Sequence, residues 1–396
     1  MEEKNYNERI WNNAFASVFI ANALMNLGQQ MVNSLVAKYA DYLGAAATLV
    51  GFLSGLFAAT ALIFKVFSGP AIDSFSRKKI LMVAMGVMVV SYIGYGVSVS
   101  VPMLMAFRLI EGAARAFTAT CCLAIASDTL SKDKFGSGIG IFSLAQAACQ
   151  AIGPTVGLTL YRYIGYNMTF IIGAVCVVLG IVATSKIKIE GKKEVKKFRI
   201  SISSIAAIEA MIPALLLFIL SGTFFTINSF LAIYGTNMGV IDIGLFFTVY
   251  AGTMLISRPV VGRLSDKYGL VKVTIPALAF FAISFYLISI STNLPMFLIA
   301  AFVAAFGYGA AQPAIQTLCM KSVPSERRGA GSNTAYIGND LGNLVGPVVA
   351  GMIVESVGYR PMWRIMIIPM VVALVITLIF KNRISTIEDN FKRNES

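Results

Sequence analysis

The sequence contains no histidine, only five cysteines and few charged residues for a chain of 396. Without histidine there is no histidine-bound metal site, and the cysteines all lie inside apolar stretches, which argues against a secreted disulfide framework. Charged residues make up 13% of the chain, about half the share that soluble domains carry. So little charge cannot cover a water-facing surface, so a soluble globular protein is excluded.

Apolar residues are abundant instead, at 57% of the chain, and the mean hydropathy is +0.77. A helix that crosses a bilayer needs about 20 mostly apolar residues. We therefore expect an all-α membrane protein with twelve transmembrane helices. The apolar stretches are 12–37, 45–67, 80–100, 103–127, 136–160, 165–184, 205–234, 243–262, 271–291, 295–318, 329–355 and 360–380.

The net charge of +13 comes from 32 lysines and arginines against 19 acids. Most of these cations fall in alternate segments between the spans, which the positive-inside rule assigns to the cytoplasm together with both termini. The opposite loops hold only Lys38, Arg162, Arg360 and Arg364. Residues 1–11 show no cleavage site, and we interpret them as a retained tail. A multi-pass protein of the cell membrane is expected, and the charge does not indicate nucleic-acid binding.

The two halves of the chain repeat each other. Gly69–Asp73 recurs as Gly262–Asp266, and Gly153-Pro154 recurs at the same spacing as Gly346-Pro347. Six spans per half give both halves the same orientation, an arrangement that suits a transporter with a central site. A channel and a membrane-embedded enzyme are alternatives that the repeat does not exclude. The predicted domains are an N-terminal six-helix bundle, a basic cytoplasmic linker and a C-terminal six-helix bundle with a short cytoplasmic tail, at 1–185, 186–204 and 205–396.

The repeated loop follows the second span of each half. In this tight turn the acid can pair with its basic neighbours or with a helix N-terminus. Such a contact can be present in one conformation and absent in another, as a gate requires. The alternative is an incidental acid in a basic loop, with Lys65 and Arg258 as cations that reach the membrane surface. The candidate gate residues are Gly69, Asp73, Arg77, Gly262, Asp266, Lys65 and Arg258.

This duplicated loop resembles the signature loop of the major facilitator superfamily, although the first copy departs from it at Ala71 and Ser76. Arg108-Leu-Ile-Glu111-Gly is similar to the Arg-x-x-Gln-Gly motif of the drug/proton antiporter branch. The Gly-Pro motifs resemble the Gly-Pro-x-x-Gly antiporter motif. The resemblance implies a twelve-span exporter in which Asp73 stabilises the outward-facing state. Packing is the alternative role for the candidate hinge residues, which are Gly153, Pro154, Gly157, Gly346 and Pro347.

Ionisable residues inside spans are costly and mark functional sites. Arg108, Glu111 and Arg115 share one face of the fourth span. They are interpreted either as an acid that responds to protons and is tuned by two arginines, or as a positive site for a substrate anion. The alternative is a purely structural Arg–Glu–Arg series that holds the helix in the bundle. Asp340 in the eleventh span is either a second proton carrier or a packing acid. The candidate proton-coupling residues are Glu111, Asp340 and Arg108.

Amides on one stripe of the first span are too many to face lipid. Further polar residues recur in the other spans, and together they predict a polar cavity; hydrogen bonding between helices is the alternative for each one. The first span lacks the acid of many multidrug transporters, which favours a neutral or anionic substrate. The candidate cavity residues are Asn22, Asn26, Gln29, Asn33, Arg115, Gln146, Gln150, Asn228, Gln312, Gln316, Tyr336 and Asn343.

The expected function is secondary active transport by alternating access, with proton-coupled export of a small polar or amphipathic molecule. The alternative is uptake or exchange of an organic anion or other metabolite, with Arg108 and Arg115 as the anion site. A membrane enzyme is disfavoured because no metal-ligand cluster or nucleophile motif is present. We expect no cofactor and no metal, a small-molecule substrate, protons and the lipid bilayer as partners, and a functional monomer.

Overall fold

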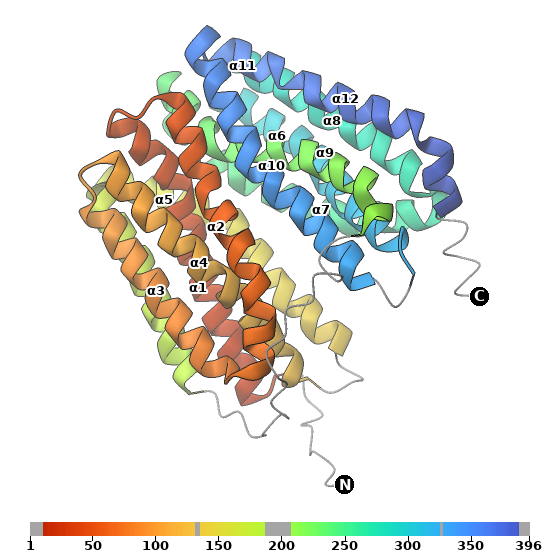
Figure 1. Cartoon of the computed structure of the whole chain (residues 1–396). Helices are drawn as coiled ribbons and strands as arrows, with labels where there is room; N and C mark the ends of the chain where they lie inside the picture. Colours follow the sequence, from red (N-terminus) through yellow and green to blue (C-terminus); the bar gives the residue numbers. More distant parts are fainter. Residues whose placement is uncertain (1–10, 131–134, 187–206, 325–327, 388–396) are drawn as a thin grey trace, which may run out of the picture. The chain divides into compact units, whose positions relative to one another are not determined.

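The computed structural model describes residues 11–130, 135–186, 207–324 and 328–387, and every regular element among them is helical (Figure 1). The expected linker 186–204 lies, apart from Lys186, outside the described residues. A 3-10 turn, Ile208–Ala210, precedes α6. The helices are α1 (Asn13–Tyr42), α2 (Ala47–Ser74), α3 (Arg77–Val97), α4 (Val101–Asp128), α5 (Phe135–Ser185), α6 (Met211–Asn237), α7 (Leu245–Tyr268), α8 (Leu270–Ile290), α9 (Leu294–Lys321), α10 (Arg328–Val357), α11 (Tyr359–Ile365) and α12 (Ile367–Ile379).

These helices are compatible with the twelve expected spans. The long α5 contains two of them, because Gly165 has φ 78° and ψ 173°, outside the helical region. Only glycine adopts such a backbone at no steric cost, so the chain turns there between the fifth and sixth spans. In the described part of the chain, nine helices are long and apolar enough to cross a membrane, among them the continuous Ala145–Ser185.

The chain forms two compact units. The first unit comprises residues 1–39 and 59–200, and the second comprises residues 40–58 and 201–396. The start of α2 therefore belongs to the second unit, while the rest of α2 belongs to the first.

In the first unit, α1 and α5 approach so closely that side chains do not fit between them. A Cβ added to Gly157 would lie 2.6 Å from the carbonyl oxygen of Met31, and one added to Gly28 would lie 2.7 Å from that of Gly173. Small residues at such contacts maximise van der Waals packing between helices in lipid. The Gly-Pro segment of α5 thus forms part of the α1–α5 contact.

In the second unit, α10 and α6 make a similar contact over three helical turns. Cβ atoms added to three glycines of α10 would lie 2.2–2.4 Å from carbonyl oxygens of α6. The spacing of four residues on both helices keeps the contact on one face of each. We call this contact the glycine ladder; it consists of Gly338 on Ala214, Gly342 on Phe218 and Gly346 on Gly222.

The start of α2 also packs on α10, within the second unit, and its contacts begin in the stretch that carries the glycine ladder. Cβ atoms added to Gly51 and Gly55 would clash with the backbone of α10 at 2.0 and 2.6 Å. Glu355 of α10 accepts a hydrogen bond from the backbone N–H of Thr48 at 2.7 Å. Thr48 is in the first turn of α2, so the carboxylate also meets the positive end of that helix dipole.

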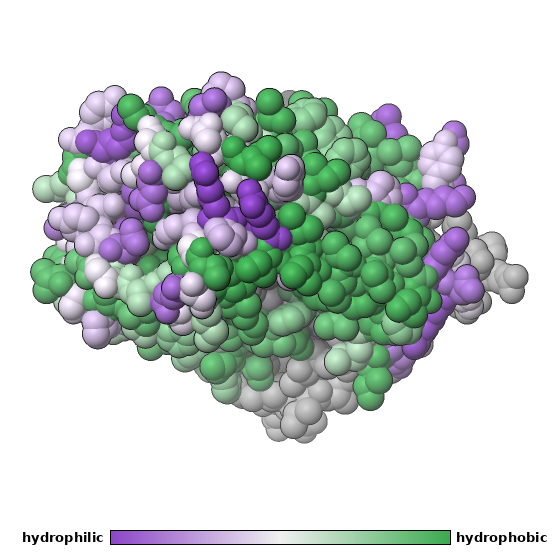
Figure 2. Space-filling view, turned by 90° about the horizontal axis from the view of Figure 1, so that it is seen from above, coloured by the Kyte–Doolittle hydropathy of each residue, from purple (hydrophilic) through white to green (hydrophobic). Residues whose placement is uncertain are grey.

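Apolar side chains remain exposed along several helices, and Figure 2 shows hydrophobic residues over large areas of one face of the molecule. On α3, for example, Val83 and Val90 are 67% and 56% exposed, and α12 exposes Ile368, Val371 and Val375. Exposed apolar surface on helices of this length is what lipid covers. The protein is therefore a multi-pass membrane protein.

Candidate functional site

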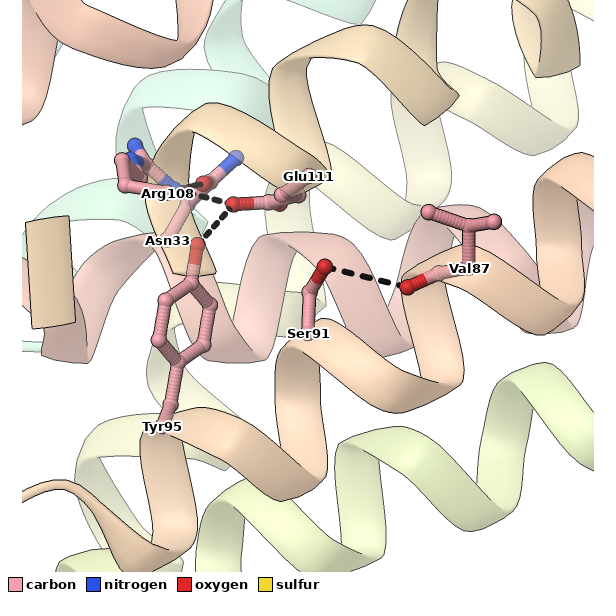
Figure 3. Close-up of polar contacts among 6 residues, drawn as sticks. All are labelled: Asn33, Val87, Ser91, Tyr95, Arg108 and Glu111. Carbon is pink, nitrogen blue, oxygen red and sulfur yellow. Dashed lines mark hydrogen bonds and ion pairs between the residues drawn. The ribbon is translucent and has the colours of Figure 1, made fainter. Parts of the chain in front are cut away.

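A buried ion pair lies inside the first unit. Arg108 and Glu111 of α4 are 2.6 Å apart, measured from Nη1 to Oε2, and their side chains are 4% and 0% exposed. The same carboxylate oxygen accepts a hydrogen bond of 2.5 Å from the hydroxyl of Tyr95 on α3. Arg108 Nη1 also donates to Asn33 Oδ1 of α1 at 2.8 Å. Three helices thus contribute side chains to one buried cluster (Figure 3).

The local sequence accounts for this arrangement. Residues three apart on a helix lie on one face, so Arg108 and Glu111 point the same way from α4. The helices α3 and α4 pack against each other, joined by a short connection, Ser98–Ser100, and Pro102 follows in the first turn of α4. Proline is favoured there because it lacks the N–H that this turn leaves unpaired.

The cluster is only partly satisfied. Glu111 Oε1 and the Tyr92 hydroxyl are buried and have no hydrogen-bond partner in the described part of the chain. Tyr92 is fully buried and interacts electrostatically with Glu111, Arg108 and Arg115. Taking two charges out of the solvent costs several kcal/mol per ion. A buried ion pair whose hydrogen-bonding groups are not all satisfied contributes little to the stability of the fold. It therefore marks a candidate site at which charge moves during function.

The α1 amides lie next to this cluster. Asn22, Asn26 and Gln29 are 0%, 7% and 2% exposed, and Asn33 is half-buried. The amide of Asn26 donates to Asn22 O and Asn22 Oδ1 at 2.7 and 2.9 Å. Neither Asn22 Nδ2 nor Gln29 Oε1 has a partner in the described residues. The predicted stripe is therefore buried, and Asn33 is its contact to the ion pair.

The second unit holds the other polar candidates. Asn343 is buried, Asp340 is half-buried and Tyr336 is exposed on α10. Gln312 and Gln316 of α9 hydrogen-bond to each other at 2.9 Å, and Asn228 bonds weakly to its own helix at 3.4 Å. In these contacts Asn228, Gln312 and Gln316 bond within their own helices.

The remaining candidates are dispersed. Lys65 and Arg258 are exposed, Arg115 and Gln146 are half-buried, and Gln150 is exposed. Arg77 Nη1 reaches the carbonyl oxygen of Ala124 at 3.5 Å, the limit of a hydrogen bond. Pro154 and Pro347 lie inside α5 and α10, and Gly153 meets Gln30 of α1. The surroundings of four gate side chains lie outside the described residues: Gly69, Asp73, Gly262 and Asp266.

Sequence inspection missed Tyr92 and Tyr95, which complete the cluster from α3. A signal for them was present. A buried tyrosine needs a partner for its hydroxyl, and these two stand three residues apart in an apolar span, on one face of the helix.

The cluster has no counterpart in the repeat. The positions in α9 that match Arg108 and Glu111 hold Ala301 and Ala304, and both are fully buried. Phe285, which matches Tyr92, packs on Trp363 at a ring distance of 5.9 Å. The second unit thus fills the matching place with apolar and aromatic side chains.

Comparisons with known proteins agree with this architecture. The sequence model of the Major Facilitator Superfamily matches residues 18–240 and 213–395. The multi-drug resistance efflux pump PmrA of Streptococcus pneumoniae is 24% identical over 88% of this chain and 91% of its own length. Its homolog in Lactococcus lactis is 28% identical over 81% of this chain and 80% of its own length.

Solved structures show the same fold. The crystal structure of the nucleoside transporter NupG superimposes with a TM-score of 0.77 at 14% identity, over 93% of this chain and 98% of that one. At that identity the likeness concerns the fold. The matched sequence model covers nearly the whole chain, and the chain therefore belongs to the major facilitator superfamily, whose members transport small molecules and are not enzymes.

Proposed function

We propose that the protein exports a small polar or amphipathic molecule across the cell membrane in exchange for protons, as a secondary active transporter that works by alternating access. The observation that carries this proposal is the buried, incompletely bonded Arg108–Glu111 pair. Relatives named as multidrug efflux pumps support the direction of transport.

Glu111 is the proton carrier in this proposal. When it is ionised, its carboxylate neutralises Arg108 and accepts the hydroxyl of Tyr95. When it takes up a proton, Arg108 keeps its charge but loses the carboxylate charge beside it, and its contact with Asn33 is to a neutral amide oxygen. Loss of one charge from a buried contact is worth about 4 kcal/mol, more than the 1–3 kcal/mol typical of coupling between sites. Protonation therefore changes which packing of α1, α3 and α4 is preferred.

The rest of the chain provides the moving parts. The bundles 1–185 and 205–396 rock about the linker 186–204, with both termini in the cytoplasm, and one chain functions as a monomer. The candidate gate residues close the loops after the second and eighth spans, and the glycines and prolines of α5 and α10 permit bending. Asp340 is the second proton carrier. The amides of both units contact the substrate, and the absence of an acid from the first span favours a neutral or anionic substrate.

Transport in proteoliposomes tests the proposal. An imposed pH gradient should drive accumulation by the unaltered protein, and Glu111→Gln should abolish that response while counterflow of substrate persists. Asp242→Asn, the same change at an exposed carboxylate of the second unit, is the matched control and should behave like the unaltered protein. A ligand-stabilisation screen of the purified protein identifies the substrate for these assays.

Two results would reject the proposal. If Glu111→Gln and Asp340→Asn both still concentrate substrate against its gradient, neither acid carries the proton. If counterflow of a labelled organic anion is insensitive to a proton ionophore and is lost in Arg108→Gln, the protein is an anion exchanger.

A further inference from the structure

The chain continues past α12 in a short amphipathic helix. Residues 381–387 are helical, and the backbone N–H of Ile384 donates to the carbonyl oxygen of Phe380 at 2.9 Å. Phe380, Ile384 and Ile387 are spaced four and three residues apart, which places them on one face of this helix. We call residues 380–387 the C-terminal segment. The side chains on its other faces are polar and exposed: Lys381, Asn382, Arg383, Ser385 and Thr386.

The apolar face of the C-terminal segment packs on the second unit. Ile384 is 4% exposed and belongs to a buried cluster with side chains from the beginning of α8 and the end of α9, against which Phe380 and Ile387 also pack. The members from those two helices are Leu270, Val271, Ala314 and Leu318. Because the protein itself covers the apolar face, only the polar face is left for a partner from outside.

The C-terminal segment lies where three apolar spans end. The span that contains α12 ends at Ile379, the span of α8 begins at Leu270, and the span of α9 ends at Lys321. Figure 1 shows α12 running beside α8, and the two helices contact each other. Helices that cross the hydrocarbon core end at the layer of the lipid headgroups. The polar face of the segment therefore lies in that layer.

The charged side chains on this surface are cations. Lys381 and Arg383 of the segment are exposed, and so is Lys272, which follows Val271 of the buried cluster in the first turn of α8. Neither residues 380–387 nor residues 270–276 contain an acid. An anionic membrane surface attracts each nearby lysine or arginine by a factor of about five. The surface thus complements anionic headgroups, whereas zwitterionic headgroups bring no net charge to it.

We propose that the C-terminal segment, together with Lys272, binds the headgroups of anionic phospholipids at the membrane surface where α12 ends. The partner is a lipid and not a soluble anion, because this surface lies at the ends of three spans, within the headgroup layer. Binding holds the segment against α8 and α9. Leu270 and Val271 directly follow the repeated loop of the second unit, so the bound segment restrains the helix on which that loop ends. The proposal is independent of the substrate and of proton coupling.

Hydrogen exchange of the full chain in nanodiscs tests the proposal. We expect the backbone amides of the C-terminal segment to exchange about tenfold or more slowly in phosphatidylglycerol than in phosphatidylcholine, since its two cations contribute a factor of about five each. The double variant Lys381→Gln with Arg383→Gln should exchange at the same rate in both lipids. In phosphatidylcholine it should exchange like the unaltered protein, because the apolar face keeps its contacts.

Two further variants show where the headgroups bind. Lys272→Gln changes no residue of the C-terminal segment, yet it should lose part of the difference between the two lipids, because the headgroups lie between α8 and the segment. Arg360→Gln with Arg364→Gln is the matched control: it removes the same charge from exposed positions of α11, at the other end of the same span, and should keep the full difference. High salt should reduce the difference in the unaltered protein, since exposed charges are screened.

Each contrary result overturns the proposal in a different way. Equal exchange of the unaltered segment in both lipids would mean that it binds no anionic headgroup. If inorganic phosphate added to phosphatidylcholine nanodiscs slows exchange as much as phosphatidylglycerol does, the surface takes a soluble anion and not a lipid. If the double variant exchanges much faster than the unaltered protein in phosphatidylcholine, the two cations hold the segment on the protein itself. If Lys272→Gln keeps the full difference, as the α11 control should, α8 takes no part in the binding surface.

Discussion

The glycine ladder gives the sharpest test of the packing, through the substitution Gly346→Ala. A Cβ at this position would lie 2.2 Å from the carbonyl oxygen of Gly222 and 2.3 Å from its Cα, whereas ordinary contact begins at 3.4 Å. The helices α6 and α10 would have to separate by roughly 1 Å to admit it, and overpacking of this kind costs about 1–3 kcal/mol. Because the opposing atoms are backbone, no rotamer change relieves the clash.

Gly252→Ala on α7 is the matched control. A Cβ there meets nothing within 4 Å, so this change only adds helix propensity, worth up to about 1 kcal/mol, and Gly346→Ala gains the same amount because it too lies in a helix. The two alanine variants should therefore differ by the overpacking cost alone, about 1–3 kcal/mol. For a unit of about 200 residues this corresponds to roughly 2–12 °C in melting temperature.

Tryptophan fluorescence during heating in detergent measures this difference. The chain has two tryptophans, and of these Trp363 is fully buried in the second unit whereas Trp11 is 55% exposed. A change in the buried signal therefore reports on the unit that contains the ladder. If Gly346→Ala melts at or above the temperature of Gly252→Ala, the backbone contact between α6 and α10 is wrong.

Other predictions concern single contacts. Arg108→Met leaves the Glu111 carboxylate buried without its cation and should lower the free energy of unfolding by about 3–5 kcal/mol. The double variant Arg108→Met with Glu111→Leu removes that carboxylate and should recover most of the loss. Equal stability of the single and double variants in denaturant unfolding would contradict the ion pair. Tyr95→Phe removes a hydrogen bond to a charged group and should cost about 1.5–3 kcal/mol in the same assay, and no loss would mean that the bond is not made. Glu355→Gln can still accept from Thr48 but loses its charge, so it should cost about 0.3–1 kcal/mol at low ionic strength. That difference should vanish in high salt, and a cost that persists there would show that charge is not the cause.

Hydropathy predicted the helices well because lipid forces long apolar stretches into helices. Hydropathy did not predict how far a helix continues beyond its apolar stretch. It ended the first span at residue 37, whereas α1 continues to Tyr42. Lys38, expected in a loop, is therefore helical and 8% exposed, and its ammonium donates to Tyr161 at 2.7 Å. The side-chain contact that permits this burial joins residues far apart in the sequence.

The candidate site was predictable in part. Spacing placed Arg108 and Glu111 on one face of α4, and spacing also placed the amides of α1 on one face. That Asn33, and not Gln29, contacts Arg108 depends on the register between α1 and α4, which no pattern within one helix contains. Tyr95 enters the cluster for the same reason, since its partner lies on a neighbouring helix.

The glycine ladder also supplies a fixed reference for studies of motion. Backbone contact at three successive turns means that α6 and α10 cannot slide or tilt against each other without breaking all three. Spin labels on exposed positions of the two helices within the ladder, Leu215 and Leu341, should therefore report one unchanging distance under every condition of substrate and pH. Such a pair calibrates the resolution of the spectrometer on the protein itself, and a distance that does change elsewhere in the chain can then be assigned to movement between rigid parts.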